Sequence, residues 1–280
     1  MTNPPPNDCF EVTIWGARGS LPVSAPRFAV FGGNTMCIEV RCGDHSLLFD
    51  AGSGLPLAGA ALLAKGQREF ALFFSHCHYD HIIGLPFFVP LYTPGAKVRL
   101  YSGHLAGEKT TRQMVFDFMA KPYFPVGPEV CLSSLEMVDF KAGDVLTPFP
   151  GVTLRTAMLH HPGNAIGYRI EWGGRAVAIV FDTDHEPGKR DATILDLIAG
   201  VEMFLYDATF TDEEFETYRY FGHSTWQEGV RLAQAAGVEK VGFVHHATFR
   251  SDTDLLQIEA AAQQQMPGAF CARDLQVIKL

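Results

Sequence analysis

The feature that most constrains this chain is a group of metal-ligand side chains placed directly after an apolar strand. Residues 70–74 are predicted to form a short buried strand, and residues 75–81 read Ser-His-Cys-His-Tyr-Asp-His. Alternate side chains of an extended segment point the same way, so His76 and His78 can reach one metal ion together. Cys77 then points away from them and is interpreted as a packing residue.

The two remaining side chains of this motif are expected to face another direction. Asp80 and His81 follow the point where the alternation breaks and where a helix could begin at Ile82. They can therefore hold a second ion. Imidazole and carboxylate ligands suit zinc, manganese or iron, and a pair of such ions activates water for hydrolysis. A polar loop with solvated histidines is the weaker interpretation, since four ligand-type residues fall within six positions.

Composition limits the class of protein. A chain of 280 residues with 47% hydrophobic residues can bury a sizeable core, as one large domain or two small ones. The net charge of −9 argues against broad, non-specific binding to nucleic acid or to an anionic membrane, although a local cationic pocket remains compatible with it. Six cysteines without a Cys-x-x-Cys pair indicate reduced thiols. Without a signal peptide or a membrane-spanning run, a cytoplasmic location and no membrane partner are predicted.

The order of predicted elements suggests one domain. Residues 1–9 are expected to be disordered, and residues 10–280 are expected to form a single domain because no linker divides them. The glycines of residues 16–20 permit a tight loop that can present N–H groups to an anion. Strands 37–40 and 46–49 are predicted to pair as a hairpin. Further strands are expected at residues 10–15, 98–101, 152–159, 175–181, 203–205, 240–244 and 275–280, and helices at residues 55–65, 107–119 and 226–236.

Three of the later strands end in ligand-type residues. Strand 152–159 runs into His160-His161, and strand 240–244 runs into His245-His246. Adjacent side chains cannot both point inward, so one histidine of each pair is expected to be a ligand. Strand 175–181 runs into residues 182–186, Asp-Thr-Asp-His-Glu, where one carboxylate can bridge two ions.

The motif His-x-His-x-Asp-His at residues 76–81 resembles the signature of the metallo-β-lactamase superfamily. The later chain is most similar to the phosphodiesterase branch, which contains tRNA 3′-processing endonuclease (tRNase Z) and the cyclic phosphodiesterases. The resemblance implies an α/β fold, a four-layer αββα sandwich of two mixed β-sheets with metal ions at one edge, over most of residues 10–280. Strands that end in ligands in both halves agree with this fold.

The resemblance also selects among the adjacent candidates. His161 lies six residues before Gly-Tyr, as the branch's ligand histidine does, and His245 is the better match of its pair. The branch pattern Thr-Asp-x-Glu selects Asp184 as the bridging carboxylate, with Asp182 as the second choice. Asp50, in an Asp-x-Gly that follows a strand, is expected to orient the site without binding metal. The expected metal ligands are His76, His78 and His161 for the first ion, Asp80, His81 and His245 for the second, and Asp184 for both.

Four later elements resemble tRNase Z in their order. These are a carboxylate-Ala-Thr-Phe motif at residues 207–210, His-Ser-Thr at residues 223–225, an Ala-rich helix and a final strand that ends in histidine. The family's glutamate is Asp207 here, one methylene shorter. The resemblance implies that His223, assisted by Asp207, protonates or stabilises the leaving alkoxide. Asp80, His223 and Asp207 are therefore the expected catalytic residues.

The expected function is a hydrolase with two divalent metal ions, zinc before manganese or iron, that acts on a small and perhaps cyclic phosphodiester through a metal-bridging hydroxide. Alternatives are a tRNase Z-like endoribonuclease, a lactone, ester or lactam hydrolase, and a non-catalytic or oxygen-binding redox module. Bacterial tRNase Z inserts a long tRNA-clamping arm between its third ligand histidine and its bridging aspartate, and His161 and Asp184 are too close for one. Nucleic acid is therefore a disfavoured partner, while a homodimer is left open. The aromatic residues 116–125 could form a lid, a dimer contact or core packing.

Overall fold

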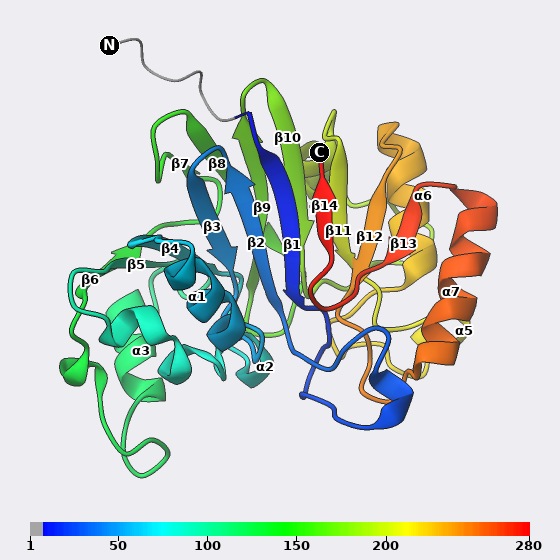
Figure 1. Cartoon of the computed structure of the whole chain (residues 1–280). Helices are drawn as coiled ribbons and strands as arrows, with labels where there is room; N and C mark the ends of the chain where they lie inside the picture. Colours follow the sequence, from blue (N-terminus) through cyan, green and yellow to red (C-terminus); the bar gives the residue numbers. More distant parts are fainter. Residues whose placement is uncertain (1–7) are drawn as a thin grey trace.

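The computed structural model describes residues 8–280, and they form two mixed β-sheets that pack face to face with helices on the outer faces (Figure 1). The first sheet contains, in spatial order, β14 (Val277–Lys279), β1 (Phe10–Gly16), β2 (Cys37–Cys42), β3 (His45–Phe49), β4 (Glu69–Phe74), β5 (Lys97–Ser102) and β6 (Ser134–Asp139). The second contains β13 (Ala269–Cys271), β12 (Val241–Val244), β11 (Met203–Asp207), β10 (Arg175–Val180), β9 (Ala165–Trp172), β8 (Val152–Leu159) and β7 (Val145–Leu146). The αββα sandwich expected from the sequence is confirmed.

The helices are short and lie between the strands in sequence. The α-helices are α1 (Leu55–Ala64), α2 (Tyr79–Ile82), α3 (Thr111–Phe118), α4 (Ala192–Ile198), α5 (Asp212–Phe215), α6 (Trp226–Ala236) and α7 (Asp252–Gln265). Single turns of 3₁₀-helix occur at η1 (Pro26–Phe28), η2 (Leu85–Phe87), η3 (Val89–Tyr92) and η4 (Pro128–Val130). No helix in the described part of the chain combines the length and the apolar character that crossing a membrane requires.

Each sheet has a parallel part, and this part determines where the polar side chains meet. Strands β3 to β6 pair in parallel in the first sheet, and strands β10 to β13 do so in the second. Parallel strands covered on both faces are almost wholly apolar, as Phe70 to Phe74 of β4 are, and all five are buried. Since parallel strands end at the same edge, the residues after them are brought together there.

Three clusters of apolar side chains hold the layers together. The largest lies between the sheets and includes residues from near both ends of the described chain, such as Phe10 and Ala272. A second cluster joins the second sheet to α4, α6 and α7, and a third joins the first sheet to α1 and α3. Helix α6 shows why such a segment folds locally, because Thr225 caps its first turn and Gly237 ends it in the left-handed conformation at φ 66°.

Most boundaries of the predicted elements agree with the structure, and two of the predicted helices differ. The sequence did not predict strands β6, β7, β9 and β13 or helices α4, α5 and α7. The helix expected at 107–119 begins only at Thr111, because the side chains of Thr110 and Gln113 form a capping box. The helix expected from Ile82 onward is α2, which begins at Tyr79 and ends at Ile82. For the expected disordered start, residues 1–7 lie outside the described residues.

Candidate metal centre

The loop after β4 brings the first four predicted ligands to the edge of the first sheet. His76 and His78 lie between the strand and α2, with ring centroids 4.4 Å apart. Asp80 and His81 lie within α2, whose first residue follows the extended His78. The change from extended chain to helix turns the second pair of side chains away from the first, as the sequence predicts.

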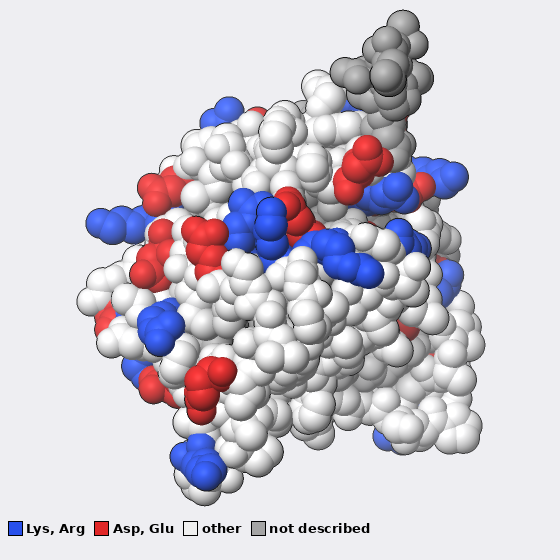
Figure 2. Space-filling view, turned by 60° about the vertical axis from the view of Figure 1, so that its left-hand side comes forward, with Lys and Arg blue, Asp and Glu red and all other residues white. Residues whose placement is uncertain are grey.

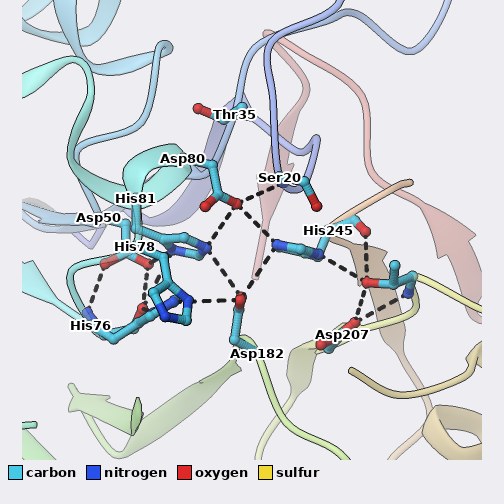
Figure 3. A network of polar contacts seen from close by, with 12 residues as sticks. Ser20, Thr35, Asp50, His76, His78, Asp80, His81, Asp182, Asp207 and His245 are labelled. Atoms are coloured by element: carbon cyan, nitrogen blue, oxygen red, sulfur yellow. Dashed lines mark hydrogen bonds and ion pairs between the residues drawn. The ribbon is translucent and has the colours of Figure 1, made fainter. Parts of the chain in front are cut away.

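The second sheet contributes one candidate ligand after each of three strands. His161 follows β8, Asp182 follows β10 and His245 follows β12. Asp182 and His245 have positive φ angles of 38° and 59°, which turn these side chains back toward the first sheet. The predicted ligand residues other than Asp184 are thus brought together at one edge of the sandwich. Figure 3 shows His76, His78, Asp80, His81 and His245 around Asp182.

The predicted ligands converge in two groups that can each hold a cation. His76, His78, His161 and Asp182 form one group, and Asp80, His81 and His245 form the other, with the potential ligand atoms of each group within 4.8 Å of one another. A third group of the same kind, Asp182, Asp207, His223 and His245, shares Asp182 with the first and His245 with the second.

The carboxylate of Asp182 lies between these groups (Figure 3). Its Oδ2 is 3.6 Å from His76 Nε2, 3.7 Å from His161 Nε2 and 3.4 Å from His245 Nε2. Its Oδ1 is 3.2 Å from His81 Nε2. Asp182 therefore has the position of a shared ligand.

The structure corrects the expected position of Asp184: it lies in neither group, and the second choice, Asp182, lies between them. Asp182 comes directly after the buried Phe181, and its left-handed backbone turns the following residues away from the site. The backbone N–H of Asp184 donates to the carbonyl of His160 at 2.8 Å, and its side chain lines a different surface cavity. A local motif match thus selected a carboxylate two residues too late.

The two neighbouring histidines that were not selected are both placed away from the groups. The side chain of His160 is 76% exposed, and its Nε2 lies 3.6 Å from Asp191. His246 is buried, and its Nε2–H donates to the carbonyl of Ala272 at 2.9 Å. His161 and His245, by contrast, lie in the groups with almost fully buried side chains.

The other ring nitrogen of several candidate ligands is held by a protein group. His81 Nδ1–H donates to Asp50 at 2.7 Å, His161 Nδ1–H donates to the carbonyl of Gly222 at 2.7 Å, and His245 Nδ1 lies 2.8 Å from the hydroxyl of Thr209. Such contacts fix ring orientation and leave the opposite nitrogen for the ion. The expected supporting position of Asp50 agrees with this geometry.

The predicted pair of His223 and Asp207 lies beside Asp182. His223 Nδ1–H donates to Asp207 Oδ2 at 2.9 Å, and the same nitrogen is 3.9 Å from Asp182 Oδ2. Asp207 is buried and also accepts from the backbone N–H of Thr183 and from Thr209. The shorter aspartate therefore still reaches the histidine.

The loop at residues 16–20 supports the site in a way that sequence reasoning missed. The backbone N–H of Ser20 donates to Asp80 Oδ2 at 2.7 Å, so the anion that this loop meets is a carboxylate of the protein itself. The buried guanidinium of Arg18 fixes the loop, because it donates to the carbonyls of Gly32 and Arg250. The two glycines of the loop were the only signal for this role.

The protonation states suit a site for cations. Burial lowers the pKa of His76 well below its ordinary value, so that this ring is neutral and can donate a lone pair. Burial alone raises the pKa of Asp182, but the neighbouring His245, His81 and His76 outweigh it and keep this carboxylate ionised. Burial likewise opposes a charge on His245, yet the carboxylates around it raise its pKa to about 9. The field of the carboxylates thus favours positive charge here.

Unpartnered atoms test whether a metal would fit these groups. The buried His76 Nε2, His81 Nε2 and Asp182 Oδ1 have no hydrogen bond of acceptable geometry, although the last two atoms lie 3.2 Å apart. Buried polar atoms are rarely left so, and each of these points into one of the two groups. Imidazole nitrogens and carboxylate oxygens in groups of three or four are ligands that zinc accepts. The residues therefore fit divalent metal ions.

A cavity of about 960 Å³ lies against the metal-ligand groups. Of the metal-ligand groups and the His223 pair, the side chains of His78, Asp80, Asp182, His223 and His245 contribute to its polar lining. Cys77 also contributes to the lining, while it packs against the third apolar cluster as expected. A substrate in this cavity would reach both groups and His223.

The fold and the site together define a hydrolase of the metallo-β-lactamase fold. Residues 45–246 match the family model described as "Beta-lactamase superfamily domain", and the chain belongs to that family.

The chain is similar to curated proteins named Ribonuclease Z, at low sequence identity. The chain is 23% identical to Ribonuclease Z of Metallosphaera sedula over 276 residues, which cover 86% of this chain and 91% of that protein. It is also 23% identical to Ribonuclease Z of Myxococcus xanthus over 280 residues, 84% of this chain and 88% of that protein.

Solved structures show the same fold at low identity. The fold is similar to that of YhfI from Bacillus subtilis, with a TM-score of 0.74 and 19% identity over 98% of this chain and 100% of that one. A diphosphatase of the PhnP family gives a TM-score of 0.70 at 20% identity over 97% and 98% of the two chains. Human tRNase Z, short form, gives 0.66 at 19% identity over 96% and 98%.

Proposed function

We propose that this protein is a phosphodiesterase with two divalent metal ions that acts on a small, in some cases cyclic, phosphodiester. The observation that carries the proposal is the position of His223. His223 is hydrogen-bonded to Asp207, lies beside the carboxylate of Asp182, and faces the same cavity as both ligand groups. A group in this position can protonate the leaving oxygen of a phosphodiester, which speeds cleavage by general acid catalysis.

His76, His78, His161 and Asp182 would hold one ion, and Asp80, His81, His245 and Asp182 the other. Two divalent ions in such a site, zinc before manganese or iron, supply an activated water at neutral pH and neutralise charge on the phosphoryl oxygens. The chain itself orients the ligands through Asp50, Thr209 and the carbonyl of Gly222.

His223 can move a proton at one defined atom. Its Nδ1–H is held by Asp207, so Nε2 is the nitrogen left for substrate. The side chain is 13% exposed, which allows contact with a bound molecule while most of the ring is shielded from water. We infer that His223, as an imidazolium, donates the proton on Nε2 to the leaving alkoxide and is left neutral with its hydrogen on Nδ1, while Asp207 holds that Nδ1–H and orients the ring.

Cleavage of tRNA precursors is the second candidate, because curated relatives are named Ribonuclease Z. The segment between His161 and Asp182 consists of β9, β10 and their connections, with no room for a protruding arm. Several arginines outside the cavity are also paired with acids, as Arg231 is with Asp212 at 2.7 Å. Both features favour a small substrate over a nucleic acid. A cytoplasmic location is part of this proposal.

Metal analysis combined with a substrate screen tests the proposal. Purified protein should contain about two divalent ions per chain and should hydrolyse bis(p-nitrophenyl) phosphate and a subset of cyclic nucleotides or cyclic phosphates. Accurate 3′-processing of a tRNA precursor at comparable efficiency would favour the second candidate. Lactone or ester turnover without any phosphodiester turnover would contradict the phosphodiesterase assignment.

A further inference from the structure

Much of the cavity lining outside the ligand groups is apolar. Ile82 of α2, Leu105, and Met114 and Phe118 of α3 line this part, together with Tyr123. Ile82 and Met114 are 5% exposed, and Leu105 and Phe118 are partly exposed, so these side chains present surface to the cavity while their other sides contact the core. This set, called the apolar wall below, lies within reach of a substrate held at the ligand groups.

The apolar wall is held in place before any substrate binds. The backbone N–H of Thr111 donates to Asp139 at 2.6 Å and its hydroxyl donates to the carbonyl of Val138 at 3.0 Å, which fixes the start of α3 against β6. Met114 and Phe118 are four residues apart, so they lie on the same side of that helix. A pre-formed apolar surface binds an apolar group without an ordering cost.

The charges around the cavity leave little support for a second phosphate. Lys109 is the one lysine or arginine among the lining residues, and its ammonium group lies 2.7 Å from the carboxylate of Asp117. Glu108 adds another negative charge to the lining. Figure 2, which brings the side with α1 and α3 forward, shows a broad area below the centre without charged side chains. A polyphosphate or an RNA backbone would meet few unpaired cations here.

We propose that the substrate carries a single phosphodiester group and an apolar substituent of several carbon atoms that lies against Leu105, Met114 and Phe118. This inference rests on the proposed function and adds to it the class of substrate. Binding energy gained at the apolar wall would hold the phosphorus at the ligand groups, where His223 faces it. A cavity of about 960 Å³ has room for both parts of such a molecule.

Alkylphosphonates of one, four and eight carbon atoms test the proposal, because they share one anionic head and differ only in apolar length. Their dissociation constants are measured by calorimetry on zinc-loaded protein, so the readout does not depend on turnover. Affinity is expected to rise by about two- to fourfold for each added methylene that becomes buried. Equal affinity for all three phosphonates would contradict the proposed apolar substituent but would not contradict the proposed phosphodiesterase activity. Absence of both phosphonate binding and phosphodiester turnover would instead overturn the proposed function.

Two substitutions test whether the alkyl chain of the phosphonate binds at the apolar wall. Leu105→Gln and Met114→Gln should each remove much of the advantage of octylphosphonate, by about tenfold, and leave the affinity for methylphosphonate unchanged. Leu256→Gln is the matched control, since Leu256 is an exposed leucine of α7 outside the cavity. Thermal unfolding checks that the variants fold, and Leu105 is partly exposed, so its variant is expected to fold. An undiminished octyl advantage in both wall variants would show that the chain binds elsewhere and would overturn the assignment.

Discussion

The two sheets contribute to the metal centre in different ways. The first supplies four candidate ligands from one short segment, residues 76–81, in which a loop passes into α2. The second supplies single residues after three separate strands, His161, Asp182 and His245. Local backbone geometry thus decides the first set, whereas the second set depends on how β8, β10 and β12 are placed within their sheet.

Two residues of the second set also have backbone conformations that cost conformational free energy. Asp182 and His245 both have positive φ angles, which residues other than glycine adopt only when the surroundings hold them there. Thr209 supplies part of that support, because its hydroxyl is 3.0 Å from the carbonyl and 2.8 Å from Nδ1 of His245. The contrast indicates that ligands of the second sheet should be more sensitive to changes in their neighbours.

The largest effect is expected from the shared carboxylate of the second set. Asp182→Asn should lower the content of both metal ions and reduce phosphodiester turnover by about a thousandfold or more, because one negative charge between the groups is lost. Asp184→Asn is the matched control and should keep metal content and turnover within about threefold. Metal analysis and kcat/KM measure both. If Asp184→Asn were the damaging change, the assignment of the bridge to Asp182 would fall.

A smaller effect is expected at His223, which lies beside the groups without belonging to the predicted ligands. His223→Ala should slow phosphodiester cleavage by about a hundredfold or more while metal content stays unchanged, which is the scale of general acid catalysis. For a substrate with a better leaving group, the same substitution should reduce the rate of cleavage less. Unchanged turnover with bis(p-nitrophenyl) phosphate and with a poorer leaving group would exclude His223 as the acid.

The dependence of one sheet on the other can be tested at Gly19. A Cβ at this position would lie 2.1 Å from Nδ1 of His245, so Gly19→Ala should displace that ring and weaken binding of the second ion by about tenfold to a hundredfold. Gly127→Ala is the control, because its Cβ would meet only the flexible carboxylate end of Glu129. Competition with a metal chelator measures the affinity. Equal metal affinity in the two variants would mean that the loop tolerates the added methyl group.

The smallest effect is expected at Asp274, where the loop at Gly33 and Asn34 meets the end of the chain. Burial raises the pKa of Asp274 from 3.8 to about 6, although two backbone N–H groups donate to it. The folded chain therefore holds this proton more tightly than the unfolded chain does. The contribution of this proton to the free energy of unfolding is present in full below about pH 4 and is lost as the pH rises through 6.

Replacement of Asp274 by Asn removes this titration. Relative to the variant, the wild-type protein should lose on the order of 1–3 kcal/mol of unfolding free energy between pH 4 and pH 7. Urea unfolding across this range measures the difference, with the exposed Asp196→Asn as a control for the loss of one charge. A difference between wild type and Asp274→Asn that does not change with pH would contradict the buried titration.

The sequence predicted ten of the fourteen strands of the described residues, and the convergence of His76, His78, Asp80 and His81, because both are local patterns. The apolar run of β4 and the spacing of residues 76–81 hold their information within a few positions. It failed at Asp184, because a short motif could not show that the backbone turns at Asp182. It also missed Ser20 and Arg18, whose partners Asp80 and Arg250 are far away in the chain.

The amino-acid order by itself determined that apolar strands alternate with helices and that histidines and aspartates follow those strands. Only the tertiary structure decided which of two adjacent histidines, or of two nearby aspartates, faces the centre. The physical reason is that periodicity specifies which face of a strand is buried, whereas the direction of the residue after the strand depends on φ and on contacts with other strands.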